Sequence, residues 1–342
     1  MSQQRKSVRV VIVNWRTPLL TERAARSLWP QLRAGDELVV VDNASANADP
    51  HDNSLTHLRH LGAELGSAGP ARFGLVQARR NGGFGYGVNL GARNLRQDAL
   101  VLLNSDAYAL EGFVEALTAP LGHDLVEATT ARLLLEGRWR LVGDGVEAQT
   151  EPAATTQSTG SAQLRGLDGG IWVSDPNGVE LINSTGNVVD ACGNGYDRSW
   201  LAPAKQEHDS PEVFGICGGA CAISARAWRQ LGGMRQDLFM YYEDTDFSYR
   251  LRRAGYSVEY VRQAQARHAH AASSDSASEA FTTWNTRNRL RVATRYAPAS
   301  VAVRALVNTG GRMLLGPQRQ ARAQGLVQAL AHAPQDLYAR IG

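Results

Sequence analysis

The sequence predicts an α/β fold built on a mainly parallel, Rossmann-like sheet that is flanked by helices. Three observations support this prediction. From Val8 to Leu103, β-branched runs alternate with segments of helical spacing, which is the order found in a doubly wound sheet. The strand-like runs are apolar throughout, as strands buried on both faces are. Polar residues follow these runs directly, and such sheets bind ligands at the carboxyl ends of their strands.

The first part of the chain is expected to hold four strands: Val8–Val13, Glu37–Val41, Phe73–Gln77 and Ala99–Leu103. A helix is expected over Thr17–Pro30, because Thr17 and Pro18 suit an N-cap and a first-turn proline. The glycine-rich segment Asn81–Gly87 is expected to be a loop that leads into a helix around Val88–Arg96.

The middle of the chain is less regular. Glu151–Gly170 is rich in Thr, Ser, Gln and Gly and is expected to be a loop, and Ile171–Arg198 holds short strand-like pieces. Regular structure resumes over Gly215–Ile223, followed by helices at Ala225–Leu231 and Asp244–Ala254. After Thr282 the chain is expected to be helical.

Composition limits the class of protein. The 342 residues are 43% hydrophobic and 20% charged with a net charge of +3, which is typical of a globular protein and gives no indication of nucleic-acid binding. No apolar stretch approaches the length needed to span a bilayer. The odd number of cysteines, three, fits a reducing compartment better than a disulfide framework. A cytoplasmic location is therefore expected.

Asp42 and Asp106 each follow the end of a predicted strand. A carboxylate on such a rigid support suits a divalent cation that bridges two phosphates. An Asx turn after the strand would explain Asp106 equally well, and this pattern alone leaves both interpretations open.

Three acids, Glu243, Asp244 and Asp246, open a predicted helix directly after the aromatic segment Phe239–Tyr242. Complementation of the helix dipole explains one or two of them. It does not explain the aromatic residues, which can form apolar walls that raise the pKa of a carboxyl group enough for it to act as a base.

His268 and His270 lie two residues apart on a strand-like segment and would point the same way. A single histidine is usually structural. Together with Asp106 from the other half of the chain, they make a shared metal site an open possibility.

The glycines of Asn81–Gly87 do not follow the first strand, so they do not form the usual dinucleotide-binding pattern. We expect them to let the backbone approach a nucleotide or another strand closely. Gly218 and Gly219 are expected to do the same beside a sugar ring.

In their order along the chain, the motifs resemble those of glycosyltransferase family 2, which has the GT-A fold, and within it the rhamnosyltransferase-like branch. The resemblance covers most of residues 8–290 and rests on nine segments: Val10–Trp15, Val39–Ser45, Asn81–Gly91, Leu102–Ala107, Gly193–Arg198, Gly218–Trp228, Phe239–Tyr256, Arg267–His270 and Trp284–Leu290.

The resemblance implies a catalytic metal ion, Mg²⁺ or Mn²⁺. Asn104, Ser105 and Asp106 stand where the family has its Asp-x-Asp motif. Because the first acid is replaced by Asn104, Asp106 is the expected metal ligand, and His268 matches the histidine that completes the site. Asn104 and Ser105 are expected to contact the substrate.

The resemblance also implies a catalytic base and a set of donor contacts. Asp244 matches the general base, and Glu243 and Asp246 would orient the acceptor or support the site. Nucleotide or substrate contacts are implied for Asn14, Asp42, Arg80, Asn81, Gly82, Gly218, Gly219, Trp284 and Arg287. Among these, Asp42 would contact the base or ribose, and Arg287 would pair with the diphosphate.

The implied reaction is inverting transfer of a hexosyl group, rhamnose from dTDP-rhamnose, to a hydroxyl of a glycan or lipid-linked acceptor in cell-surface polysaccharide synthesis such as that of O-antigen. UDP-sugars remain open as donors. Residues 1–280 would form the catalytic domain, with a nucleotide-binding half of about 1–110 and an acceptor half of about 111–280. Residues 281–342 would form a helical, basic extension. Two alternatives are a sugar nucleotidyltransferase and a non-catalytic carbohydrate-binding protein; the oligomeric state is open.

The C-terminal extension carries nine arginines and one acid, a charge of +8 from nine minus one. With its interleaved apolar residues, it could lie on an anionic surface at the inner membrane. The alternative is a tail packed on the catalytic domain. Gly310–Gly311 and Gly316–Pro317 favour this second interpretation, because they are expected to break the helix.

Overall fold

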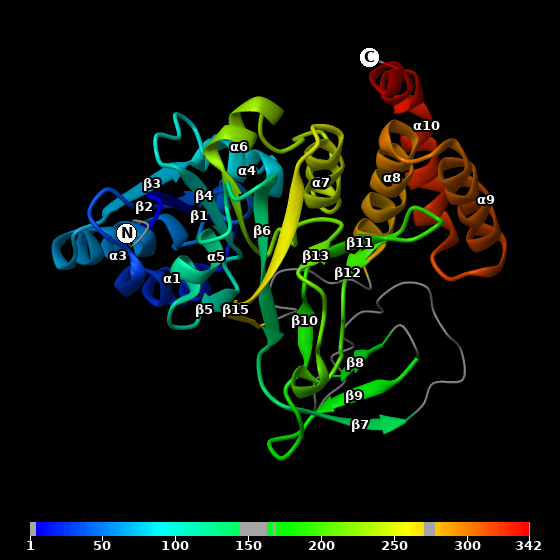
Figure 1. Cartoon of the computed structure of the whole chain (residues 1–342). Coiled ribbons are helices and arrows are strands. Elements are labelled where there is room, and N and C mark those ends of the chain that lie inside the picture. Colours follow the sequence, from blue (N-terminus) through cyan, green and yellow to red (C-terminus); the bar gives the residue numbers. More distant parts are fainter. Residues whose placement is uncertain (1–4, 144–162, 167–168, 270–277, 342) are drawn as a thin grey trace.

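The computed structural model describes residues 5–143, 163–166, 169–269 and 278–341. A large sheet forms the centre of the molecule, a smaller sheet lies beside its lower end, and three C-terminal helices stand against one side (Figure 1). His270 and most of Glu151–Gly170, two segments singled out above, lie outside the described residues.

The central sheet has the strand order β13-β15-β6-β14-β4-β1-β2-β3, with β10 paired to β6 and β5 to β15. Its longer strands are mainly parallel, because only β14 runs against β4 and β6. The ten strands are β1 (Val8–Asn14), β2 (Glu37–Asp42), β3 (Arg72–Gln77), β4 (Ala99–Leu103), β5 (Ala107–Ala109), β6 (Val126–Leu135), β10 (Ile182–Ser184), β13 (Glu212–Val213), β14 (Ala220–Ser224) and β15 (Ser257–His268).

Helices cover both faces of this sheet, which confirms the predicted α/β architecture. One core contains Val10 and Ile12 of β1 with α1, α3 and α5; the other contains Val11 with α4, α6 and α7. Alternate residues of β1 therefore point to opposite apolar layers, which is why the strand is apolar throughout. These helices are α1 (Pro18–Leu28), α3 (Ser54–Ala68), α4 (Phe84–Gly91), α5 (Phe113–Thr118), α6 (Ala225–Leu231) and α7 (Glu243–Arg253).

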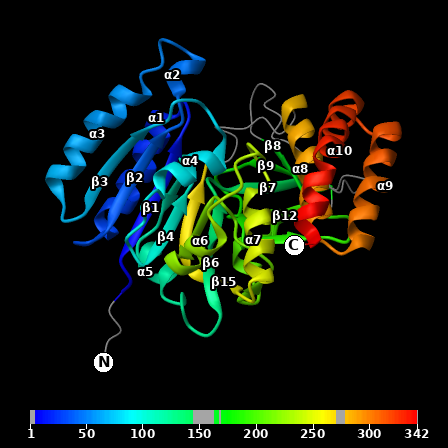
Figure 2. The same cartoon turned by 90° about the horizontal axis from the view of Figure 1, so that it is seen from above.

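The remaining elements lie outside the central layers (Figure 2). A short helix α2 (Ser45–Ala48) follows β2. Of two small sheets, one has the strand order β7-β9-β8 and the other pairs β11 with β12. Their strands are β7 (Trp139–Gly143), β8 (Gln163–Arg165), β9 (Ile171–Ser174), β11 (Asn187–Val189) and β12 (Gly195–Asp197). The C-terminal helices are α8 (Glu279–Tyr296), α9 (Ala299–Leu315) and α10 (Arg319–Ile341).

Two local expectations were wrong. The helix placed around Val88–Arg96 begins at Phe84, inside the glycine-rich segment, and ends at Gly91. A Cβ on Gly87 or Gly91 would come 2.6 Å from a valine of β1, so the glycines let this helix pack closely on the strand. That close packing outweighs the low helix propensity of glycine, and it confirms the expected close approach to a strand.

The second wrong expectation is the break at Gly310–Gly311. Helix α9 runs through both glycines without interruption and ends before Gly316, as predicted there. Helix α3 was not predicted, although Leu58, Leu61 and Leu65 have helical spacing and are buried. Among the described residues, no helix combines the length and apolarity needed to cross a bilayer.

Candidate active site

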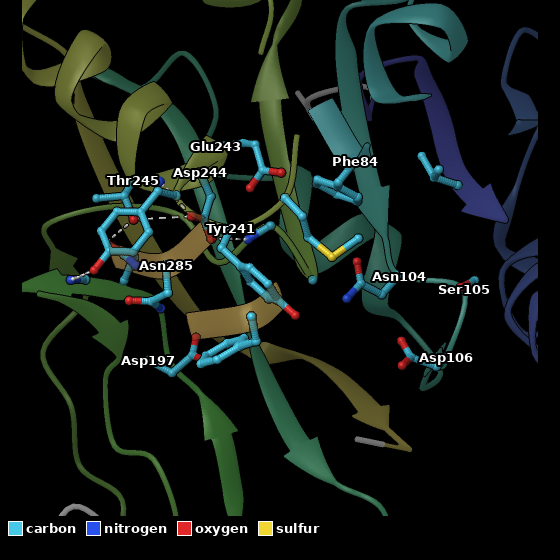
Figure 3. Close-up of a pocket in the computed structure, with 18 of the residues that line it drawn as sticks. Phe84, Asn104, Ser105, Asp106, Asp197, Tyr241, Glu243, Asp244, Thr245 and Asn285 are labelled. Carbon is cyan, nitrogen blue, oxygen red and sulfur yellow. Dashed lines mark hydrogen bonds between the residues drawn. The ribbon is translucent and has the colours of Figure 1, made fainter. Parts of the chain in front are cut away.

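A cavity of about 370 Å³ opens at the carboxyl ends of β1 and β4. The opposite wall comes from the first residues of α7 and α8 (Figure 3). This is the edge of the sheet where the sequence predicted ligand binding. Eight of the predicted site residues line it: Asn81, Asn104, Ser105, Asp106, Gly218, Gly219, Glu243 and Asp244.

The structure brings Asp106 and His268 together although they are far apart in the chain. Strand β15 pairs with β5 so that His268 lies opposite Ala107, and the His268 Nε2 atom is 2.9 Å from the Asp106 Oδ1 atom. The other ring nitrogen, Nδ1, is 2.6 Å from the Asn183 Oδ1 atom. Burial lowers the pKa of His268, but the Asp106 carboxylate outweighs it and the net shift is upward.

This pair fits the expected divalent cation. Donation from Nδ1–H to Asn183 leaves Nε2 as the ligand atom in the neutral ring, which is the usual arrangement of a metal-bound histidine. Within the described part of the chain, no cluster of three or more His, Cys, Asp and Glu side chains could hold a metal ion. Two protein ligands suffice for Mg²⁺ or Mn²⁺ when substrate phosphates and water complete the coordination.

Asp244 lies in the first turn of α7 on the far side of the cavity from Asp106 (Figure 3). The Gly218 N–H donates to its Oδ2 atom at 3.0 Å and the Thr245 N–H to its Oδ1 atom at 2.6 Å. Burial raises the pKa of Asp244 against these hydrogen bonds. The carboxylate is therefore held in a fixed orientation and has the raised basicity that proton abstraction needs.

The two acids beside Asp244 have different surroundings. Glu243 lines the cavity and is 4% exposed, and burial raises its pKa to about 8. Its Oε1 atom is buried without a hydrogen-bond partner among the described residues, so at neutral pH it can offer a proton to a ligand hydroxyl. Asp246 does not line the cavity: it is fully buried and pairs with Arg250 at 2.8 Å and Arg235 at 3.5 Å. It supports α7 from behind.

Asp197 is a site residue that the sequence analysis missed. It ends β12 and lines the cavity near Asp244 (Figure 3). Burial raises its pKa to about 6, and the Asp244 carboxylate adds to the rise. The segment Gly193–Arg198 carried part of the family resemblance, so a signal was present, but no local pattern indicated that this strand faces Asp244.

The predicted nucleotide contacts divide into two groups. Asn81 lines the cavity, where its Oδ1 atom accepts from Asn43 at 3.0 Å. Gly82 does not line it, and its N–H donates to the Asn43 Oδ1 atom at 3.4 Å. Asn14 and Asp42 lie deeper: the Asn14 amide donates to Asp42 at 2.9 Å, and both residues are at most 1% exposed. Their side chains hold the ends of β1 and β2 together, and a direct nucleotide contact of Asp42 stays a prediction.

Arg80, Trp284 and Arg287 do not line the cavity. Arg80 is exposed over the ring of Tyr86, and Trp284 packs on Phe239 with ring centroids 4.9 Å apart. The Arg287 guanidinium donates to the Leu238 carbonyl at 2.5 Å, and burial lowers its pKa. In this structure Arg287 holds the loop before α7, and its contact with a diphosphate stays a prediction.

That loop, Leu238–Tyr242, is strained and is held by α8. Phe239, Tyr241 and Tyr242 all have left-handed backbone angles, with φ between 66° and 71°, which costs on the order of 1 kcal/mol or more per residue. The Asn288 amide nitrogen lies 2.8–3.0 Å from the carbonyl oxygens of residues 238, 240 and 241. The two N–H bonds of one buried amide are therefore shared among three carbonyls, which fixes the loop that leads to Asp244.

We expect Asn288→Ala to be among the more destabilising single substitutions in the chain. It removes the shared donor of three carbonyls, and a buried group left unpaired costs about 1–3 kcal/mol. Urea denaturation measures the loss. Asn285→Ala, one turn earlier on the same helix, is the matched control and should change the unfolding free energy far less. Equal stability of the two variants would show that the loop does not depend on Asn288.

Comparison with known proteins bears on the fold. No family model matches the sequence. Over 121 residues, the chain is 33% identical to N-acetylglucosaminyl-diphospho-decaprenol L-rhamnosyltransferase of Mycobacterium tuberculosis. That match spans 34% of this chain and 39% of the relative's length.

Solved structures extend the likeness to the whole fold. A mannosyltransferase from Pyrobaculum calidifontis, in complex with GDP-Man and Mn²⁺, aligns with a TM-score of 0.52 at 15% identity. The alignment covers 96% of this chain and 76% of the mannosyltransferase chain. GalNAc-T7 with UDP, GalNAc and Mn²⁺ aligns with a TM-score of 0.57 at 13% identity. That alignment covers 99% of this chain and 58% of the GalNAc-T7 chain. The chain has the GT-A fold of nucleotide-sugar glycosyltransferases.

Proposed function

We propose that the protein is an inverting, metal-dependent glycosyltransferase of family 2 that transfers rhamnose from dTDP-rhamnose to a hydroxyl of a lipid-linked or free glycan, in cell-surface polysaccharide synthesis. One observation carries the proposal: Asp106 and Asp244 line a single cavity at the carboxyl ends of the strands, and His268 contacts Asp106 from behind that lining. Such a cavity can hold a diphosphate at one side and an acceptor hydroxyl at the other.

The reaction proposed is a single displacement. Asp244 takes the proton of the acceptor hydroxyl while the acceptor oxygen bonds to the anomeric carbon. The bond from that carbon to the diphosphate oxygen breaks, and the nucleoside diphosphate leaves with the electron pair. Asp106 and His268 would hold the divalent cation, which when bound supplies positive charge to the leaving diphosphate. Glu243 and Asp197 would orient hydroxyl groups of the substrates.

The experiment that tests this function measures release of nucleoside diphosphate from nucleotide sugars with and without a glycan acceptor. Acceptor-stimulated release of dTDP is the expected result. Formation of a nucleotide sugar from a sugar phosphate and a nucleoside triphosphate would instead identify a nucleotidyltransferase. Binding without turnover of either kind would identify a carbohydrate-binding protein.

We expect dTDP to bind more tightly than UDP, and UDP more tightly than GDP. The rhamnosyl donor is inferred from the curated relative and the sequence resemblance, and a pyrimidine ring fits the predicted role of Asp42. A nucleotide at a hundredfold excess over its Kd stabilises the folded state by about 2.7 kcal/mol, which thermal shift detects. Arg80→Ala provides a control, because it tests for nucleotide contacts outside the cavity. A clear preference for GDP would contradict the pyrimidine assignment.

A further inference from the structure

The outward face of α9 is apolar. Val303, Val307 and Leu314 are 58%, 71% and 73% exposed, and their spacing places them in one stripe of the helix. The opposite side of α9 carries the buried Ala305 and Thr309. A surface helix of a globular protein normally has polar residues where this stripe lies, so the stripe requires an explanation.

Helix α10 repeats the pattern. Val327 and Tyr338 are 66% and 82% exposed, on the side of the helix away from Ala329, which packs into the core shared with α8 and α9. Leu330 and Leu337 flank this stripe and are about half exposed. The two helices are neighbours in the C-terminal layer, with α9 at the outer rim of the molecule (Figures 1 and 2).

The charge on this surface has one sign. Asp336 is the single acid between residues 299 and 341, and it is fully buried in ion pairs with Arg235 and Arg291. Arg304 and Arg319 are exposed beside the apolar stripes. Much of the +8 charge of the C-terminal segment is internal, since Arg289 and Arg291 are 1% exposed. Apolar contact must therefore contribute more to binding by this surface than the sequence suggested.

We propose that the outward face of α9 and α10 docks on a membrane surface that contains anionic lipids. The apolar stripes would enter the boundary between headgroups and acyl chains, and Arg304 and Arg319 would lie at the level of the lipid phosphates. A second copy of the chain fits less well, because a two-fold contact would bring the same basic surface against itself. The proposal rests on the lipid-linked acceptor of the proposed function, and vesicle binding itself requires no sugar donor.

The test is co-sedimentation of the full chain with phosphatidylcholine vesicles, with and without phosphatidylglycerol. We expect binding to the anionic vesicles that weakens with salt. The triple variant V303S/V307S/L314S should reduce the partition coefficient by more than about tenfold. The control variant L19S/L125S/V179S changes three other exposed apolar residues and should bind as the wild type does.

Failure of the wild type to bind, or equal binding of the triple variant, overturns the proposal. The proposal is also overturned if the wild type self-associates in sedimentation velocity and binds no vesicles while the triple variant is monomeric. The stripe is then an interface between copies of the chain. Turnover of a detergent-free soluble acceptor is measured on the same samples. Vesicle binding without any transfer activity would contradict the proposed function but would still support the docking surface.

Discussion

Replacing Asp244 by asparagine is expected to lower turnover by roughly 10²–10⁴-fold, the usual contribution of a general base. The amide keeps the size of the carboxylate but cannot accept the proton. Donor binding should be largely retained. Because burial raises the pKa of Asp244, the wild-type rate should also fall as the pH is lowered through that raised pKa, where the base becomes protonated. The measurement is the initial rate of nucleoside diphosphate release across pH.

Asp244→Asn is also expected to lower the stability of the protein, and this loss must be separated from the loss of turnover. The carboxylate accepts from Gly218 and Thr245 with different oxygens, whereas asparagine has one acceptor, so one N–H loses its partner at a cost of about 1–3 kcal/mol. The thermal shift with donor must therefore be compared with the melting temperature of the same variant alone. Glu243→Gln is the matched control next in the chain and should retain more activity.

Normal turnover of Asp244→Asn would exclude it as the base. Asp246 would not be the replacement, because its carboxylate is buried in ion pairs with Arg250 and Arg235. The candidates would then be Glu243 and Asp197, which also line the cavity and, unlike Asp106, are not proposed as metal ligands.

Replacing Asp106 by alanine, or removing divalent cations with a chelator, is expected to lower the rate of transfer sharply. The ion is expected to stabilise the leaving diphosphate by several kcal/mol, and each 1.4 kcal/mol is a factor of about ten in rate, so the loss should be on the order of 10³-fold. Adding Mn²⁺ or Mg²⁺ back should restore the chelated wild type but not Asp106→Ala. The measurement is the transfer rate with each ion in excess.

Two further variants sharpen this prediction. Asn183→Ala removes the partner of His268 Nδ1 and should weaken metal affinity by about 10–100-fold, as loss of an outer hydrogen-bond partner does. Asp175→Asn changes a partly exposed carboxylate that pairs with Arg140 and does not line the cavity, and it should leave transfer unchanged. Full wild-type activity in chelator would remove the metal from the mechanism.

The sequence by itself determined the features that depend on neighbouring residues. Apolar β-branched runs indicate buried strands, and a polar residue directly after such a run must lie at the carboxyl end of the sheet. Both Asp42 and Asp106 were placed in this way. The acids that open α7 were likewise predicted from their position after an aromatic segment. These inferences need only the periodicity and termini of single elements.

The tertiary structure decided which distant side chains meet. The pairing of β15 with β5 brings His268 to Asp106. The packing of α8 on the loop Leu238–Tyr242 turns Arg287 and Trp284 toward that loop. The same packing left the apolar side of α9 facing outward, which the sequence pattern could not distinguish from a buried face. A local pattern gives the period of an element, but the strand register and the partner of each face are set by contacts between segments far apart in the chain.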